Sequence, residues 1–131
     1  MLRPEHYLNL EESDHAVLFE GQSRVWEALK SLKSYIDKHV SAERHHTTMG
    51  EPAFIGEHVS IGEGTVVEAG AVIKGPAIIG KNCQIRSNAY IREYVIIGDN
   101  CVVGNATEIK HSLLFNHAVA PHFNYIGDSI L

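Results

Sequence analysis

Residues 71–109 read AVIKGPAIIGKNCQIRSNAYIREYVIIGDNCVVGNATEI, and a six-residue period runs through this stretch. A β-branched aliphatic residue recurs at every sixth position, and a small or short-branched residue stands two positions before each one. Neither an amphipathic helix nor an alternating strand produces two such columns at period six. The aliphatic column is Ile55, Ile61, Val67, Ile73, Ile79, Ile85, Ile91, Ile97, Val103 and Ile109. The second column is Ala53, Val59, Thr65, Ala71, Ala77, Cys83, Ala89, Val95, Cys101 and Thr107.

The two columns predict a solenoid of short parallel strands, in which three consecutive hexapeptides, each a strand with its turn, make one coil. Each large aliphatic points inward and stacks on its equivalents in neighbouring coils, about 4.8 Å away. We therefore expect an all-β fold, a left-handed parallel β-helix of about four coils over residues 51–131. A β-sandwich would instead show turn signals at intervals of about 8–12 positions.

The repeat departs from its period once, near the C-terminal end. Ile126 and Gly127 resemble another repeat start, yet Ile126 comes one position too early for a full coil after Ile109. The irregularity lies within residues 111–125. Solenoids carry their chemistry on loops and irregular edges, so this segment is where we expect the functional site.

The N-terminal part of the chain, residues 1–50, lacks the repeat. Ser23 is a candidate N-cap for a helix from about Arg24 to His39, and residues 41–50 are expected to form a connector. We expect this helix to cover the open apolar end of the first coil. Its apolar stripe is Val25, Leu29, Leu32 and Ile36, with Trp26 and Val40 at the margins.

Composition excludes several classes of partner. The net charge is −5, and no basic block is present, which disfavours nucleic acid and anionic membranes as partners. The N-terminus has no apolar signal core, and no apolar run approaches the length of a membrane span. Cys83 and Cys101 are too few for a disulfide framework, and their spacing of one coil places both in the core. We expect a cytoplasmic protein.

The residue after each inward aliphatic lies at the start of a turn, so such residues that are one coil apart share an edge of the solenoid. One edge carries Lys74, Arg92 and Lys110, which we call the cation edge. Like charges at coil spacing repel unless a counter-charge is present. At this point two explanations remain open: the side chains splay into solvent, or the edge receives an anionic ligand such as a phosphate.

Three histidines, His111, His117 and His122, fall within the irregular segment. Neutral imidazole is a suitable base for taking a proton from an amine near pH 7. A zinc site of the kind found in hexapeptide-repeat carbonic anhydrases would need a further histidine two coils upstream. The positions two coils before His117 and His122 hold Lys81 and Arg86 instead, so we expect no metal site.

The stretch NAYIREYVIIGDNCVVGNATEIKHSLLFNHAVAPHFNYIGDSIL, which ends at Leu131, resembles the β-helical acetyltransferase domain of bifunctional N-acetylglucosamine-1-phosphate uridyltransferases and related sugar-1-phosphate enzymes. In that family the sequence GHLTYLGD carries the catalytic base, and APHFNYIGD looks like its counterpart. The resemblance implies that His122 is the base. It also implies that Arg92 and Lys110, which precede His122 at the family's spacings, bind phosphate, and that Tyr125 contacts the sugar.

The resemblance further implies acetyl-CoA as co-substrate, an amino-sugar phosphate or nucleotide sugar as acceptor, and a homotrimer. We add Lys74, on the same edge, to the candidate substrate-binding residues and expect the cation edge to lie beside His122. Residues 1–50 hold nothing like the family's uridyltransferase domain. The family's β-helix also continues past the position of Leu131, so we expect the acetyl-CoA site to be incomplete here.

Two alternatives to this enzyme remain. One is a non-catalytic β-helical oligomerisation or ligand-binding module of a sugar nucleotidyltransferase. The other is a related acyltransferase that acts on UDP-sugars, because the β-helix is shared across that group.

Overall fold

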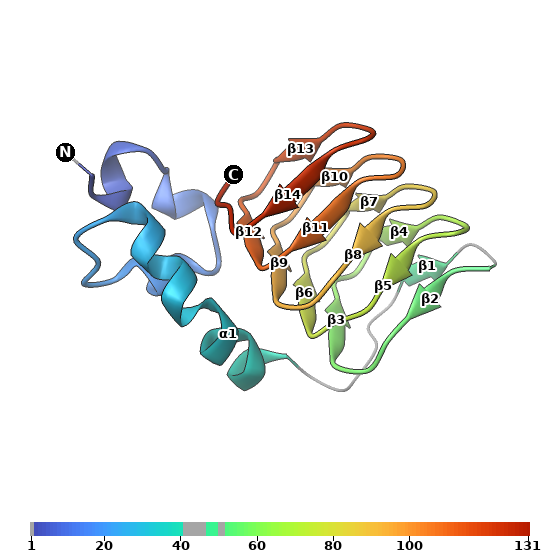
Figure 1. Cartoon of the computed structure of the whole chain (residues 1–131), viewed down its shortest axis with the longest axis horizontal. Helices are drawn as coiled ribbons and strands as arrows, with labels where there is room; N and C mark the ends of the chain where they lie inside the picture. The colour runs from blue at the N-terminus through green and yellow to red at the C-terminus, as the bar shows by residue number, and fades with distance from the viewer. Residues whose placement is uncertain (1, 41–46, 50–51) are drawn as a thin grey trace.

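The computed structural model describes residues 2–40, 47–49 and 52–131, and shows a parallel β-helix with a helical segment along one side (Figure 1). Sheet A has the strand order β1-β4-β7-β10-β13, sheet B the order β2-β5-β8-β11-β14, and sheet C the order β3-β6-β9-β12. The strands are β1 (Thr47–Met49), β2 (Phe54–Ile55), β3 (Val59–Ile61), β4 (Thr65–Val67), β5 (Val72–Ile73), β6 (Ala77–Ile79), β7 (Gln84–Ile85), β8 (Tyr90–Ile91), β9 (Val95–Ile97), β10 (Val102–Val103), β11 (Glu108–Lys110), β12 (Ser112–Leu114), β13 (Val119–Ala120) and β14 (Tyr125–Gly127).

Both sequence columns lie inside the solenoid. Every residue of the aliphatic column is at most 7% exposed, and the small column is buried except for the partly buried Ala53. Cys83 and Cys101 lie in this core, and each thiol donates to a backbone carbonyl, of Gly98 at 3.1 Å and of Phe115 at 3.0 Å respectively. The predicted all-β parallel solenoid of about four turns is therefore confirmed.

The break in the period can now be placed to the residue. Ile91 pairs with Ile109, three full hexapeptides further on, whereas Val95 pairs with Ser112, which comes one position sooner than a full coil. The turn between β11 and β12 is therefore one residue shorter than the turn between β8 and β9. His111 forms this short turn and takes a φ of 44°, in the left-handed region that non-glycine residues adopt at a cost of about 1–2 kcal/mol.

The N-terminal segment consists of short 3-10 turns followed by one α-helix. The predicted helix is present, but its start and cap differ from the expectation. Residues Val25–Glu27 form a 3-10 turn, and Ser23 is not the N-cap. Instead the Glu27 carboxylate reaches back and accepts from the amides of Ser23 and Arg24, at 3.1 and 3.0 Å, which satisfies donors that a cap would otherwise serve. The elements are η1 (Pro4–His6), η2 (Leu10–Glu12), η3 (Ala16–Phe19), η4 (Val25–Glu27) and α1 (Ala28–His39).

The cap, by which we mean residues 2–40, packs against the outer face of sheet C and not against the end of the first coil (Figure 1). Leu32 and Ile36 of α1 are fully buried in a cluster that includes Ile96 and Leu113. These two solenoid residues point outward from the middle of β9 and β12. Because outward aliphatics on sheet C would otherwise be exposed to water, this face offers the apolar stripe of α1 its best partner.

The connector expected over residues 41–50 lies mostly outside the described residues. Strand β1 is the exception, and it pairs with β4 upstream of the expected boundary at residue 51. Among the described residues, no helix combines the length and apolarity needed to cross a bilayer.

Truncating one inward aliphatic should destabilise the whole solenoid. Ile91→Ala should lower the free energy of unfolding by about 2–5 kcal/mol, because Ile91 is fully buried and its neighbours are held in place by coils on both sides. Urea unfolding followed by circular dichroism measures this. Gln84→Ala, at an exposed outward position, should change stability by less than about 0.5 kcal/mol. Equal losses in the two variants would contradict the inward stack.

The cap should weaken on acidification through His15. Burial lowers the pKa of His15, against the raising effect of Asp14 and Asp99. The unfolded chain therefore binds this proton more readily, so stability is greatest above about pH 6.5 and falls as the pH drops through that value. When the pH is lowered from about 7.5 to about 5.5, the free energy of unfolding should fall less in His15→Gln than in the wild-type chain, as urea titrations at the two pH values would measure. The exposed His6→Gln is the control and should behave as wild type; identical pH dependence in all three proteins would refute the assignment.

Candidate functional site

The three cations of the cation edge lie on successive coils where sheet B turns into sheet C. Lys74, Arg92 and Lys110 each follow a buried isoleucine of sheet B, and the backbones run in parallel, with Lys74 N donating to Ile91 O and Arg92 N to Ile109 O. Both carboxylates that Arg92 contacts are local. Its guanidinium lies 3.3 Å from Glu93 and 3.3 Å from Glu108. The counter-charge that the edge requires is therefore supplied by the chain itself.

Glu93 is the electrostatic centre of this edge. Its pKa is held below the usual value, first by a hydrogen bond from its own backbone amide and then by the charges of Arg92, Lys74 and Lys110, against the opposing effect of burial. The hydrogen bond to Glu108, with the charges of both glutamates, raises the pKa of Arg92. Glu93 Oε2 is buried without a hydrogen-bond partner among the described residues. A ligand donor at this corner would satisfy that oxygen.

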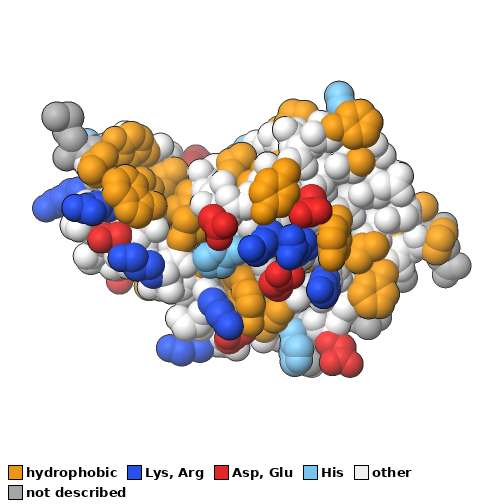
Figure 2. Space-filling model, viewed as in Figure 1, with side chains coloured by type: hydrophobic (Ala, Val, Ile, Leu, Met, Phe, Trp, Pro, Cys, Tyr) orange, Lys and Arg blue, Asp and Glu red, His pale blue; other side chains and the backbone are white. Residues whose placement is uncertain are grey.

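The outer face of sheet B adjoins the cation edge and carries Tyr90, Glu108 and Tyr125 in register on successive coils. On the face seen in Figure 2, basic, acidic and hydrophobic side chains lie next to one another over these strands. Tyr125 is 63% exposed, and its ring lies over Gly127, where an added Cβ would come within 2.5 Å of the tyrosine hydroxyl. Glycine at position 127 therefore leaves room for the ring of Tyr125 above the strand.

His122 lies in the turn between β13 and β14, where sheet A turns into sheet B. It is exposed, and its ring meets Phe123 edge-on with 5.1 Å between centroids. The expectation that His122 lies beside the cation edge is thus corrected, because sheet B separates them and the turns come at opposite ends of its strands. A strand of about three residues spans about 10 Å, so a ligand that touches both ends must lie across this sheet.

The three histidines that the sequence groups together occupy three different corners of one coil. His111 follows β11 of sheet B, His117 follows β12 of sheet C, and His122 follows β13 of sheet A. Since a sequence interval of one hexapeptide is one side of the solenoid, neighbours in sequence are separated in space. Within the described ranges, no three histidine, cysteine, aspartate or glutamate side chains are grouped to hold a metal ion.

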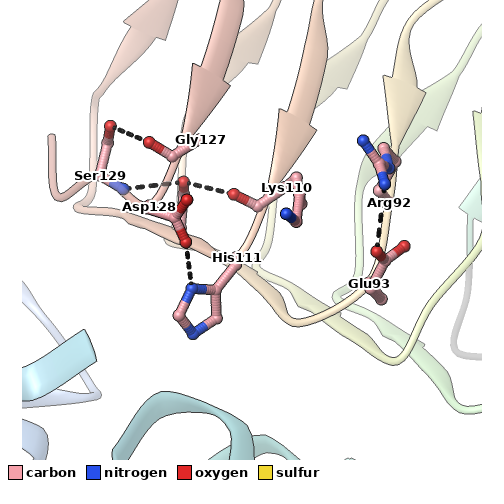
Figure 3. A network of polar contacts seen from close by, with 8 residues as sticks. Arg92, Glu93, Lys110, His111, Gly127, Asp128 and Ser129 are labelled. Atoms are coloured by element: carbon pink, nitrogen blue, oxygen red, sulfur yellow. Dashed lines mark hydrogen bonds and ion pairs between the residues drawn. The ribbon is translucent and has the colours of Figure 1, made fainter. Parts of the chain in front are cut away.

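A further polar pair stands next to the cation edge. His111 Nδ1 lies 2.6 Å from Asp128 Oδ1, and the Asp128 amide donates to the carbonyl of Lys110 at 3.2 Å (Figure 3). The hydrogen bond to His111 lowers the pKa of Asp128; burial opposes it, and the charges of His111 and Lys110 add to the lowering. The short turn thus holds an imidazole against a carboxylate directly beside Lys110.

Sequence reasoning placed the cation edge but missed its partners. The sequence signal for the His111–Asp128 pair is the shortened interval, which puts Asp128 one coil above the short turn. Glu93 follows Arg92 directly, and Glu108 stands in the outward column of sheet B, so both could have been found by sorting residues onto faces. No pattern in the sequence indicates which carboxylate each cation contacts.

Comparison with known proteins identifies the repeat. Residues 76–111 match the family profile described as bacterial transferase hexapeptide (six repeats), and residues 49–74 match the hexapeptide repeat of succinyl-transferase. No curated protein shows significant similarity to the chain. The chain therefore carries hexapeptide repeats of the bacterial transferase type.

Among solved structures, the chain is similar to the acetyltransferase domain of PglB from Neisseria gonorrhoeae FA1090. The complex of that domain with acetyl coenzyme A superposes with a TM-score of 0.53 at 16% identity, over 64% of this chain and 45% of that one. A second structure of the domain gives a TM-score of 0.56 at 13% identity, over 89% of this chain and 68% of that one. The chain thus has the β-helix fold of a hexapeptide-repeat acetyltransferase and spans less than half the length of the first of these structures.

The His111–Asp128 contact can be tested by titration. In His111→Gln, the pKa of Asp128 should rise toward that of an aspartate without a partner, because the hydrogen bond and the positive charge that favour its ionised form are lost. Carbon-13 NMR of the aspartate carboxyl groups measures the change. His117→Gln, at another corner of the same coil, should leave the Asp128 titration as it is. If His111→Gln also left it unchanged, the pair would not exist in solution.

Proposed function

We propose that the chain belongs to an N-acetyltransferase that moves the acetyl group of acetyl-CoA onto the amino group of an amino-sugar phosphate of the glucosamine-1-phosphate type. The arrangement of sheet B carries the proposal. Its outer face has cationic side chains suited to phosphate at one end, a histidine at the other, and the exposed Tyr125 between them. In glucosamine 1-phosphate the amine on C2 neighbours the phosphate on C1, so the long side chains of Arg92 and Lys110 must reach over sheet B for one ligand to meet both them and His122.

Arg92 and Lys110 are the proposed phosphate ligands, with Lys74 one coil further along the edge. A guanidinium binds a phosphate through two parallel hydrogen bonds, so Arg92 must exchange at least one of its glutamate contacts for the ligand. Both contacts are 3.3 Å long and only partly buried, and ion pairs so exposed contribute little to stability. The exchange therefore costs little.

His122 is the proposed general base, and Tyr125 contacts the sugar. Neutral His122 takes a proton from the amine as its nitrogen attacks the thioester carbonyl carbon of acetyl-CoA. The tetrahedral intermediate then collapses, the carbon–sulfur bond breaks, and the proton passes to the departing thiolate of coenzyme A. The products are the N-acetyl sugar phosphate and free coenzyme A. No cysteine nucleophile is required, and both cysteines are buried in the core.

Acetyl-CoA as donor is supported by the fold, because the PglB acetyltransferase domain has been solved with acetyl coenzyme A. We expect a homotrimer with sites between subunits. Val66 and Val119 on the outer face of sheet A are 39% and 59% exposed, and a neighbouring subunit on that face would cover them. We also expect a cytoplasmic protein with neither nucleic acid nor membrane as its partner, given the net charge of −5 and the lack of a basic block.

A non-catalytic ligand-binding module is the second candidate. It is favoured by the share of the PglB structure that the chain covers, 45%, because the proposed sugar-phosphate face lies wholly on the coils described here. Isothermal titration separates the two functions. The module binds glucosamine 1-phosphate but not coenzyme A, whereas the enzyme binds both.

The role of His122 is tested by the substitution His122→Ala. Removing the base should lower kcat for acetyl transfer to glucosamine 1-phosphate by about 10²–10⁴-fold, with little change in KM, because Arg92 and Lys110, and not His122, bind the phosphate. Release of free thiol from acetyl-CoA measures the rate. His117→Ala, also exposed in a turn of the same coil, should keep the wild-type rate. A His122→Ala enzyme of undiminished kcat would remove the proposal.

A further inference from the structure

A groove of about 310 Å³ lies between the cap and the last coil of the solenoid. It has two aromatic walls, and one carboxylate stands at its rim. Tyr7 and Trp26 leave 60% and 45% of their surface exposed, and both line this one groove. The lining residues are Tyr7, Leu8, Val25, Trp26, Leu29, Asp128 and Ile130.

Asp128 connects this groove to the cation edge. Its side chain lines the groove and also accepts the hydrogen bond of His111, while its amide donates to the carbonyl of Lys110. Figure 3 shows the imidazole of His111 turned away from Arg92, with Asp128 above it and Lys110 alongside. A ligand seated in the groove can therefore extend past Asp128 onto the side chains of Lys110 and His111 without crossing the solenoid.

The charges at this junction suit an anion. His111 uses Nδ1 for Asp128, which leaves Nε2 as a donor when the ring is protonated, and protonated His111 neutralises Asp128. Lys110 takes part in no ion pair among the described residues. Arg92 stands one coil further along the same edge. The carboxylates near an incoming phosphate are Asp128, Glu93 and Glu108, and each has one of these cations or His111 as a neighbour.

We infer that this groove binds the nucleoside of a nucleotide sugar, with the diphosphate on Lys110 and His111 and the sugar lying over sheet B toward Tyr125 and His122. The inference rests on the proposed function and extends its acceptor from a sugar phosphate to a nucleoside diphosphate sugar, which contains a sugar phosphate. The volume of about 310 Å³ is at the lower end for ligand sites, enough for a nucleoside while the rest of the ligand lies outside.

A nucleobase is the group that best matches this groove. Flat aromatic rings stack on Tyr and Trp side chains, and the stack tolerates different bases. The guanidinium of Arg24 lies 5.8 Å from the centroid of Trp26 and helps to hold the indole in place. The Asp128 carboxylate at the rim can accept hydrogen bonds from a ribose hydroxyl or a base N–H. A bare sugar phosphate would make no use of the two aromatic walls.

Trp26 makes the inference directly testable, because it is the single tryptophan of the chain and lines the groove. The full chain is titrated with UDP, uridine and inorganic pyrophosphate while tryptophan fluorescence is followed. UDP should quench Trp26 and bind at least about 10-fold more tightly than either fragment. Tyr7→Ala should weaken the binding of UDP about 10-fold through loss of base stacking and leave the binding of pyrophosphate unchanged. Lys110→Ala should weaken the binding of both.

Phe54→Ala is the matched control, an exposed aromatic on the first coil that should bind UDP as the wild-type chain does. UDP binding no tighter than pyrophosphate, or equal losses in Tyr7→Ala and Phe54→Ala, would overturn the inference. Its failure is distinguishable from failure of the proposed function. Acetylation of glucosamine 1-phosphate that depends on His122, without UDP binding, refutes only the nucleoside site. UDP binding without acetyl transfer to any amino-sugar acceptor refutes the proposed function and leaves the site in place.

Discussion

Isoleucine and valine side chains from successive coils lie over one another in the solenoid, and the other positions take their places from that stack. Because each inward residue is fixed by the coil above and the coil below, every position between two inward residues is assigned to a face or a corner. Three cations that stand one full coil apart in sequence thereby become neighbours, while histidines only about one hexapeptide apart are distributed to different corners. Residues one coil apart in sequence are therefore neighbours in space, whereas residues one hexapeptide apart lie at different corners. This rule decides which side chains can share one functional surface.

The same constraint decides how much could be predicted. The two columns predicted the fold class, the buried cysteines and the stacking of Lys74, Arg92 and Lys110, because all of these depend only on the period. The position of the cap was missed. The signal for it was present in AII, VII and SLL, residues 77–79, 95–97 and 112–114, where the strands of sheet C are apolar or small throughout instead of alternating. An outward aliphatic column requires a cover, and α1 supplies it on the side of the solenoid.

Side-chain partners on the functional edge could not be predicted, since the period places backbones and leaves the rotamers of long charged side chains undetermined. Arg92 contacts one glutamate of its own turn and one from the next coil. The charges of Arg92, Lys74 and Lys110 all lower the pKa of Glu93. These glutamates reduce the repulsion among the three cations of the cation edge. An anionic ligand can then replace a glutamate as the partner of Arg92. Shortening the turn at His111 by one residue adds an imidazole–carboxylate pair at the same place.

The central claim is that one ligand lies over sheet B, within reach both of the side chains of the cation edge and of His122. Chemical-shift mapping with glucosamine 1-phosphate on isotope-labelled protein tests this most directly. The account predicts that the side-chain signals of Arg92 and Lys110 and those of Tyr125 and His122 shift together, with a single dissociation constant. Shifts confined to one end of the sheet, or a His122 signal that stays still at saturation, would contradict it.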